Sequence, residues 1–427
     1  MRKSNVGSVI YANQALYSSF VANDYHFGNS IAEDENCALR NLPFHDCSGN
    51  QVRPLFRLQG LNYGLKTNYI NLNQYGQAAR FDAVIGSSPD VTLDFEYVLG
   101  DGYNEQIAGF VLDGKTNALS KHFMLDGRFG SNFFIAVAPP GHGIIHANLE
   151  DFGDKLSIVG IGNAFLSQYA VTAEVGAAPR ARLSFDAFNM RSYKGFCNLP
   201  VPNINIEKNC LESNIKFSLP DILSTGNYPT LFDSEQFDLS NLIGGVRPAD
   251  VKISLGDGAT LSKQLSEFDN YDDGSAHIQG FTINVPIGNT KINRIGSIFA
   301  YARSNNFPAR INVQVRAVVG QLKQSPACVN ALCSKKPVDI VLSLNDCRTV
   351  KECDGELVSG NSNMKFIIKN AILSSESFSL NLSDSKVVDL NFIASVAGPE
   401  DEGQGLFISA NSYLPDRPQV LAWGLPL

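Results

Sequence analysis

The stretch Pro89-Asp90-Val91-Thr92-Leu93-Asp94-Phe95-Glu96-Tyr97 decides the fold class of this chain. From Val91 to Tyr97, apolar and polar residues alternate without interruption. Successive side chains of a strand point to opposite faces, so this alternation predicts a strand with one buried and one solvated face. Antiparallel sheets contain many such strands, whereas strands of parallel sheets are usually apolar on both faces. The stretch therefore predicts a mainly β protein with antiparallel sheets.

Three other segments alternate in the same way: Arg182 to Asp186, Ile311 to Ala317, and Val388 to Phe392. Their apolar positions predict a core-facing side, and their polar positions predict a second, solvated side. The polar residues of the four segments are Thr92, Asp94, Glu96, Arg182, Ser184, Asp186, Asn312, Gln314, Arg316, Asp389 and Asn391.

The composition of the 427 residues agrees with short strands joined by turns. Charged residues make up 18%, against roughly 25% in an average globular protein, while there are 36 Gly and 27 Phe. The net charge is −8 and no Lys/Arg run is present, which argues against tight nucleic-acid binding. Ser4 to Asn23 contains no continuous apolar segment of the kind a signal peptide has. The longest clean apolar run, Phe133 to Ala138, is far shorter than the roughly 20 residues of a membrane span, so we expect cytoplasmic synthesis without membrane insertion.

The chain also repeats itself. Leu58-Gln59-Gly60-Leu61 and Ile278-Gln279-Gly280-Phe281 begin two similar segments, and a second glycine follows at the same spacing in both, at Gly76 and Gly296. A later pair consists of Asn163 to Ser167 and Asn370 to Ser374. It too is followed in both copies by an equally spaced residue of one type, Phe185 and Phe392. Landmarks that recur in the same order predict an internal duplication.

We expect the duplication to form tandem domains that meet near residue 200, where Cys197 to Asn209 is rich in Pro and Asn. Helical signal is weak, and its best candidate is Asn117 to Met124, with a repeat near Asn330 to Lys335. The expected division is 1–52 for an N-terminal arm and the first strands of domain 1, 53–199 for domain 1, 200–245 for a connector and the first strands of domain 2, and 246–427 for domain 2 with a cysteine-containing insert at about 321–360.

One segment imitates a nucleotide-binding motif. Gly109 to Thr116 fits the pattern G-x-x-x-x-G-K-[ST] literally. A phosphate loop needs a buried strand before it, but Asp101 to Gln106 is polar, and the bulky Phe110, Val111 and Leu112 prefer a strand. Asp113 would also repel phosphate. We interpret the segment as an ordinary Gly-Lys turn and expect no cofactor.

Other reactive residues suggest no catalytic site. His142 and His146 are set in the turn Pro139-Pro140-Gly141-His142-Gly143 and just after it, without a nearby carboxylate or cysteine to complete a ligand set. The acidic cluster Asp269, Asp272 and Asp273 lacks the spacing and the final Glu of a calcium loop. No motif of a serine hydrolase or a zinc protease is present. We therefore expect a protein that is not an enzyme.

The eight cysteines fall into four close pairs and leave three alternatives open: free thiols, disulfides or a zinc site. The weak metal candidates are Cys328, Cys333, Cys347 and Cys353, whose spacings are looser than those of the usual zinc knuckles.

The order of these motifs resembles that of phage tail-tube (major tail) proteins. The resemblance rests on Gln59-Gly60 before a strand, the later glycine Gly76, and the alternating stretch Pro89 to Tyr97. It also includes Ile161 to Ser167 with the downstream Leu-Ser-Phe. It covers about 53–195 and, in a weaker form, 275–410. The second unit departs from the pattern because it lacks the acidic strand face and carries the cysteine-containing insert.

The resemblance implies two tandem tail-tube-like β-sandwich domains, each with a short helix, whose inner sheets join around a ring into a closed β-barrel. It implies a structural virion protein that stacks in rings as a tail tube for genome delivery. Its partners would be further copies, the tail terminator and the tail-tip or baseplate proteins, while the tape-measure protein and DNA pass through the lumen. Alternatives are a tail adaptor, tail-tip or baseplate hub ring, or the tube of an injection system; a carbohydrate-active β-enzyme is a distant one.

Two expectations about the assembly follow. Tail-tube rings have about six domains around the channel, so a chain with two of them implies a trimeric ring with pseudo-sixfold symmetry. The eleven polar strand residues named above are expected to form much of the channel wall. Four acids against two arginines among them predict a mildly negative lumen, which would reduce adhesion of DNA.

Overall fold

The computed structural model describes residues 14–21, 53–110, 112, 116–120, 130–141, 155–194, 204–205, 210–211, 246, 251–255, 276–293, 295, 302–319, 337–345, 362–379, 386–396, 398, 401 and 403–410. These residues form a mainly β structure with antiparallel strand pairs and one short helix, α1 (Tyr103–Ile107). The expected β class and antiparallel pairing are confirmed. No described helix is long and apolar enough to cross a membrane.

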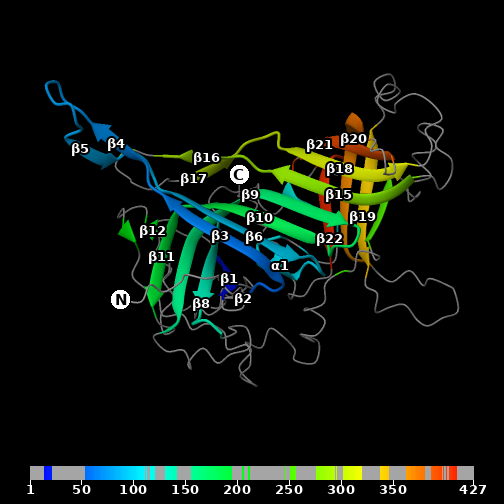
Figure 1. The fold of residues 1–427 in the computed structure, drawn as a ribbon, viewed down its shortest axis with the longest axis horizontal. Coiled ribbons are helices and arrows are strands. Elements are labelled where there is room, and N and C mark those ends of the chain that lie inside the picture. Colours follow the sequence, from blue (N-terminus) through cyan, green and yellow to red (C-terminus); the bar gives the residue numbers. More distant parts are fainter. Residues whose placement is uncertain are drawn as a thin grey trace, which may run out of the picture.

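Eight strands form a central sheet that runs through the molecule (Figure 1). In spatial order they are β3 (Leu58–Lys66), β6 (Asp90–Val98), β10 (Arg180–Ala187), β9 (Ser157–Glu174), β15 (Ala276–Pro286), β18 (Arg310–Val319), β21 (Lys386–Ser395) and β20 (Ser362–Ser379).

A second layer covers one face of this sheet. The long strands β9 and β20 take part in both layers, because their first halves pair with strands outside the central sheet. On the side of β9 the second layer consists of β1 (Gln14–Val21), β2 (Arg53–Pro54), β8 (Gly130–Val137) and β11 (Asn189–Lys194). On the side of β20 it consists of β14 (Val251–Leu255), β19 (Val338–Asn345), β22 (Gly405–Ala410) and β7 (Asn117–Ala118).

The core lies between the two layers. Phe95 of β6 stacks on Phe185 of β10, with ring centroids 5.9 Å apart, and both contact Phe133 of β8 in the second layer. Tyr169 of β9 and Phe366 of β20 meet at 6.3 Å, so the core continues from one half of the sheet to the other. Aromatic pairs at these separations add to the energy gained by burial. The alternating apolar positions of the sequence form one face of this core, as predicted.

The central sheet has two halves, β3-β6-β10-β9 and β15-β18-β21-β20, and the strand pairing of both follows the same register. Leu58 pairs with Tyr97 and Gly60 with Glu96, leaving Gln59 as a bulge; Ile278 pairs with Ala317 and Gly280 with Arg316, leaving Gln279 as a bulge. Position 60 therefore corresponds to position 280. The pairing of β9 with β10 corresponds in the same way to that of β20 with β21. Leu166 pairs with Phe185 and Leu373 pairs with Phe392, and the register shifts next to both pairs. Bulges re-aim a strand, so the strands of both halves change direction at corresponding positions.

Two hairpins extend from the ends of the corresponding strands β3 and β15. The first consists of β4 (Tyr69–Leu72) and β5 (Asp82–Ile85), and the second of β16 (Asn289–Ile292) and β17 (Ala302–Asn305). The β4–β5 hairpin projects away from the body, whereas β16–β17 lies along it (Figure 1). Two further short strands, β12 (Ile204–Asn205) and β13 (Cys210–Leu211), pair with each other.

The helix expected at Asn117 to Met124 does not begin at Asn117, because Asn117 and Ala118 form strand β7 and pair with β22. Ser120 is helical, and the rest of the expected helix, 121–124, lies outside the described residues. Helix α1 occupies the polar segment before it. Its polar residues are buried and bonded: Asn104 accepts a hydrogen bond from Phe56 N and donates one to Phe56 O. A polar segment can enter the core when its hydrogen bonds are satisfied there, which a hydrophobic pattern does not reveal. The expected helix near Asn330 to Lys335 lies outside the described residues, as do most of the boundary segment Cys197 to Asn209 and the range 321–336.

Candidate functional site

The eleven polar residues predicted from strand alternation all lie on the face of the central sheet that the second layer leaves uncovered. The register brings them together in two groups. On β6 and β10, Asp94 lies opposite Ser184 and Glu96 opposite Arg182. On β18 and β21, Gln314 lies opposite Asn391 and Arg316 opposite Asp389. We call this surface the polar face.

The strands between these groups, β9 and β15, complete the polar face with residues that the sequence reasoning missed. Gln168 of β9 donates a hydrogen bond to Asn284 of β15 at 2.7 Å, and Thr172 lies opposite Thr282. The bulge in β9 interrupts its alternation, so a simple period of two does not reveal which of its residues share a face.

Every predicted acid on the polar face has a cationic neighbour. Three ion pairs join neighbouring strands: Arg182–Asp94 at 3.6 Å, Arg180–Glu96 at 2.9 Å and Arg316–Asp389 at 2.9 Å. The fourth joins Asp186 to Arg303 of β17 at 3.5 Å. The hydrogen bond and charge of Asp389 raise the pKa of Arg316 above its ordinary value. Adding Arg180 and Arg303 to the eleven residues counted from the sequence gives four acids and four arginines, so the charge of this set is more balanced than predicted.

The central sheet continues from one half to the other through the pairing of β15 with β9, which we call the internal seam. Gly280 to Pro286 pair antiparallel with Glu174 to Gln168. At the two ends of this pairing, Ile287 N donates to Ser167 O and Val175 N donates to Gln279 O, each at 2.8 Å. Backbone bonds thus extend beyond the strands themselves and hold the halves in one register.

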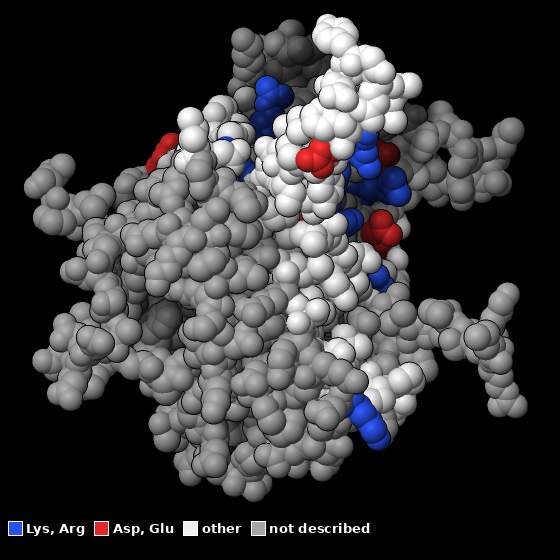
Figure 2. All heavy atoms as spheres, turned by 90° about the vertical axis from the view of Figure 1, so that its left-hand side faces the viewer, with Lys and Arg blue, Asp and Glu red and all other residues white. Residues whose placement is uncertain are grey.

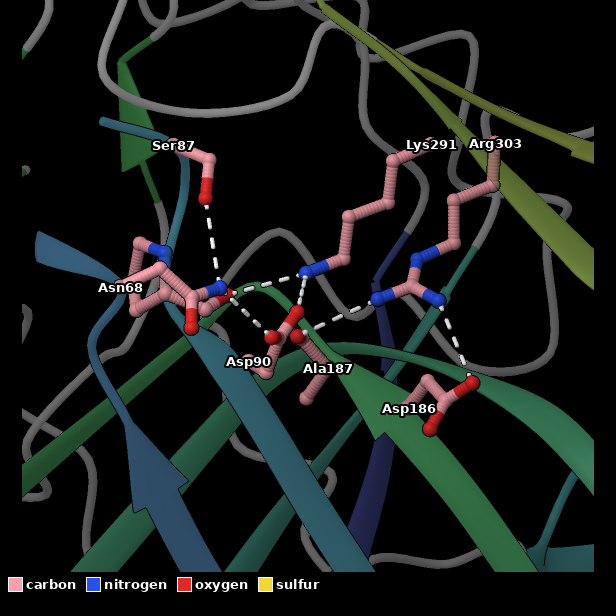
Figure 3. A network of polar contacts seen from close by, with 8 residues as sticks. Asn68, Ser87, Asp90, Asp186, Ala187, Lys291 and Arg303 are labelled. Carbon is pink, nitrogen blue, oxygen red and sulfur yellow. Dashed lines mark hydrogen bonds and ion pairs between the residues drawn. The ribbon is translucent and has the colours of Figure 1, made fainter. Parts of the chain in front are cut away.

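The β16–β17 hairpin strengthens the internal seam through charged contacts (Figure 3). Lys291 donates to Pro89 O at 3.1 Å and to the carboxylate of Asp90. Asn68 donates to the other carboxylate oxygen of Asp90 at 3.1 Å. The hydrogen bond from Lys291 is the main reason why the pKa of Asp90 lies below its ordinary value. Charge-assisted hydrogen bonds of this type are stronger than neutral ones.

Arg303 is the most deeply placed cation of this seam, with 3% of its surface exposed. Its guanidinium donates to Ala187 O at 3.3 Å and lies over the rings of Phe188 and Phe165, 4.9 Å and 5.5 Å from their centroids (Figure 3 shows the polar contacts). Burial lowers the pKa of Arg303, and the charge of Asp186 opposes this effect. The planar guanidinium of Arg303 thus connects the β16–β17 hairpin to the first half of the sheet.

Two carboxylates are fully enclosed in the core rather than presented at a groove. Asp101 pairs with Arg57 at 3.2 Å, and both side chains are 6% exposed. Glu105 of α1 lies near the hydroxyl of Tyr169, and burial raises its pKa. A glycosidase needs two carboxylates that flank a bound sugar. A sealed pair in contact with a guanidinium and with tyrosines does not fit that chemistry.

The phosphate-loop-like segment also has a different context from a nucleotide site. It follows helix α1 and precedes strand β7, whereas a phosphate loop follows a strand and precedes a helix. Phe110 and Leu112 are buried, and the ring of Phe110 contacts Tyr169 at 5.0 Å. Phe110 and Leu112 therefore belong to the core, whereas Thr116 is exposed.

The remaining candidates lie largely outside the described residues. This applies to His142, His146, the acidic cluster at 269–273, and all cysteines except Cys210, which belongs to β13. The metal candidates Cys328, Cys333, Cys347 and Cys353 are among them. Within the described ranges, no group of three or more His, Cys, Asp or Glu residues could hold a metal ion.

No protein-family model matches the sequence, and no curated protein matches it. Several solved structures align with part of the chain. The anti-feeding prophage cap, described as a tube-terminating cap, aligns at 11% identity and a TM-score of 0.25 over 39% of this chain and 92% of the other. The sheath/tube terminator of an extracellular contractile injection system aligns at 11% identity and 0.25 over 39% and 98%. The anti-feeding prophage baseplate aligns at 9% identity and 0.24 over 44% and 96%.

Proposed function

We propose that the chain is a structural subunit of a tail tube, whose copies join edge to edge into a closed ring. One observation carries this proposal. Among the described strands, β3 pairs only with β6, and the second half of β20 pairs only with β21. The internal seam joins the counterparts of these same two strands, β15 and β9. Each copy thus has the edges of β3 and β20 at the two ends of its sheet, while the counterparts of these strands, β15 and β9, already pair with each other within the chain.

Such edges favour closed assembly. An exposed strand edge offers unpaired N–H and C=O groups to any other strand, which is an aggregation hazard unless the edge is covered. A contact between β3 of one copy and β20 of the next is head-to-tail, and contacts of this kind form either rings or open filaments. A ring would pair both edges of every copy and would turn the open sheet of a single chain into a barrel.

The second layer decides which face of that barrel lies inside. The apolar face of the central sheet packs against β8 and β19 and their neighbours, so this side must lie outward. The polar face then lines the channel. This supports the expected lumen position of Thr92, Asp94 and Glu96 and of the other polar strand residues. The paired charges described above would give the wall little net charge, so that neither DNA nor a protein would be held strongly.

The size of the barrel agrees with a conduit. Three copies of the eight-stranded sheet would supply 24 strands. With strands about 4.8 Å apart and tilted by about 40°, the barrel would measure about 150 Å around and about 48 Å between opposite backbones. Barrels of eight strands are filled by their own side chains, whereas this one would keep an open channel.

We further propose that each copy holds two tandem tail-tube domains, that three copies make a pseudo-sixfold ring, and that the rings stack into a virion tail for genome delivery. The corresponding registers of the two halves and the resemblance of the sequence motifs support this arrangement. Terminator and tip or baseplate proteins would bind the ends of the stack, while the tape-measure protein and DNA occupy the channel. The role is mechanical and requires no catalytic residue.

Electron microscopy and native mass measurement of the purified chain test the proposal. The expected result is a ring of three chains of 46.4 kDa each, stacked into tubes. Rings that never stack would point to an adaptor or terminal ring instead. Six chains per ring would mean that only one half lines the channel, which contradicts the tandem arrangement. A chain that stays monomeric at high concentration would refute the proposal.

A further inference from the structure

The outer edges of β3 and of the second half of β20, with which no other described strand pairs, carry residues suited to burial. Tyr63 and Leu65 of β3 are 42% and 49% exposed, although they lie on the core-facing side of the sheet. Their counterparts on β15, Ile283 and Val285, are 1% and 0% exposed because β9 covers them. The difference in exposure comes from the missing neighbour strand, since the pairing on the other side is the same in both halves.

The same comparison applies to the opposite edge. Ile372 of β20 is 49% exposed, whereas its counterpart on β9, Phe165, is 7% exposed beneath the guanidinium of Arg303. At the internal seam, the β16–β17 hairpin supplies that cover. The position that corresponds to Arg303 is Ala83 of the β4–β5 hairpin, because both hairpins pair in the same register. The β4–β5 hairpin projects away from the body, and no described strand of the chain's other half lies beneath it (Figure 1).

The chemistry of the two hairpins differs. The internal seam joins Lys291 and Arg303 to Asp90 and Asp186. The corresponding residues of the β4–β5 hairpin are Asn71 and Ala83, and those of the surface that would receive it are Arg310 and Ile393. No pair of opposite charges remains. Instead the hairpin exposes four apolar side chains, namely Tyr69, Ile70, Val84 and Ile85. Figure 2 views the molecule from the side of this hairpin, where most of the described surface is neither acidic nor basic.

From these observations we propose that a second copy of this chain occupies the β3 edge and the β4–β5 hairpin, in the register of the internal seam but through apolar rather than ionic contacts. We call this junction the external seam. It deepens the proposed function, on which it rests, by naming the contact that closes the ring.

The correspondence between the two halves fixes the register of the external seam. In the internal seam, Thr282 lies opposite Thr172 and Asn284 opposite Ala170. In the external seam, the counterparts of these residues would take their places. Asn62 would then lie opposite Ser379 of the partner copy, Gly64 opposite Ser377 of the partner copy, and Lys66 opposite Ser375 of the partner copy. Tyr63 and Leu65 then become buried, and Ile372 is covered by the hairpin.

The division of chemistry has a physical purpose. Within one chain the halves are at high effective concentration, so the internal seam can use charged contacts that set register more than affinity. Copies must find one another from solution, and burial of apolar surface provides a driving force that salt does not screen. Apolar contacts at one seam and ionic contacts at the other also oppose pairing of unlike edges.

A pair of cysteine substitutions tests the register. Gly64→Cys with Ser377→Cys should form a disulfide between copies under mild oxidation, giving covalent dimers and trimers on a non-reducing gel. A Cβ at Gly64 would lie 3.6 Å from Thr92 Oγ1, an ordinary contact, so the change should be tolerated. The matched control is Asn284→Cys with Ala170→Cys, which are paired at the internal seam and should give only monomer-sized product. Wild type, with its eight native cysteines, provides the background.

A third variant places the cysteines out of register. Gly64→Cys with Ser379→Cys should cross-link at least tenfold less than the in-register pair. Equal cross-linking by both variants would overturn the proposed register. Rings visible by electron microscopy but without a disulfide in the in-register pair would overturn the external seam while leaving the proposed function intact. A protein that remains monomeric would overturn both.

A second measurement addresses the chemistry of the seam. Leu65→Asp should abolish ring formation, whereas Val175→Asp, which changes an even more exposed apolar residue outside the external seam, should not. Wild-type rings should persist in 1 M NaCl, roughly a 3 Å Debye length. Rings that dissociate in salt, or that tolerate Leu65→Asp, would contradict an apolar seam.

Discussion

Replacing Arg303 by alanine tests the argument that a buried cation holds the two halves of the sheet together. The change removes the hydrogen bond to Ala187 O and the contacts with Phe165 and Phe188. It also leaves Asp186 without its cationic neighbour. Because β17 belongs to the second half and the other partners to the first, the loss should appear at the internal seam.

The expected magnitude follows from these contacts. A hydrogen bond from a charged donor contributes about 1.5 kcal/mol at this rather long distance, and each desolvated ring contact about 1 kcal/mol. The ion pair with Asp186 adds less than about 1 kcal/mol, because 38% of that carboxylate's surface is exposed. Against these gains stands the cost of burying the guanidinium, which is the main reason why its pKa is lowered. We therefore expect a net loss of about 2–3 kcal/mol.

Hydrogen exchange read by mass spectrometry is the appropriate assay, because it reports the local opening free energy of each segment. In Arg303→Ala, amides of β16, β17 and the paired parts of β15 and β9 should exchange roughly 30- to 150-fold faster, which corresponds to about 2–3 kcal/mol. Arg303→Lys keeps the charge but loses the planar stacking and should lie between wild type and alanine. A change below about 0.5 kcal/mol, or equal acceleration in β19 and β20, would refute the reasoning.

Three further predictions concern the core. Burial raises the folded-state pKa of Glu105, so its contribution to stability is present below the ordinary pKa of 4.5 and is lost as pH rises through the raised value. Glu105→Gln should therefore have a higher unfolding midpoint than wild type at neutral pH, and this difference should disappear in acid. A difference between the two proteins that does not change with pH would contradict the pKa argument. In Gly100→Ala, the new Cβ would meet Arg57 Nη1 at 1.8 Å and displace it from Asp101. We expect this to cost about 3 kcal/mol in urea unfolding, whereas an unchanged midpoint would show that the buried pair can shift freely. Phe185→Ala should cost about 3–5 kcal/mol, since its ring contacts both Phe95 and Phe133; Thr92→Ala on the polar face is the matched control and should cost under about 0.5 kcal/mol.

Much of the polar face was predictable from the sequence. In β6, β10, β18 and β21 the alternation is uninterrupted, and the faces it predicts are those observed. Alternation did not predict the faces of β9, where a bulge shifts the pattern. It also did not predict helix α1, whose buried polar residues have the sequence pattern of a loop. Both failures have the same origin, because a local pattern records the side of a strand only while the strand is regular and its polar residues are solvated.

The charge balance could not be predicted from alternation either. Arg303 and Arg180 lie outside the counted positions, and Arg303 reaches Asp186 from the other half of the chain. Nothing in the neighbourhood of Asp186 reveals this partner. Long-range pairs of this kind depend on how the hairpins lie on the sheet, which is decided by packing.

By itself, the sequence determined the β class, the two faces of the regular strands and the correspondence between the halves of the chain. These properties depend on local spacing, because side chains alternate along a strand and repeated segments form similar elements. Only the tertiary structure decided that β15 pairs with β9, and that β3 and the second half of β20 remain without that partner within the described chain. It also decided that one hairpin contacts the sheet through ionic side chains while the other exposes apolar ones. Those properties depend on which strands come to lie side by side, and strand neighbours are selected by burial and backbone pairing over the whole molecule rather than by any short stretch of residues.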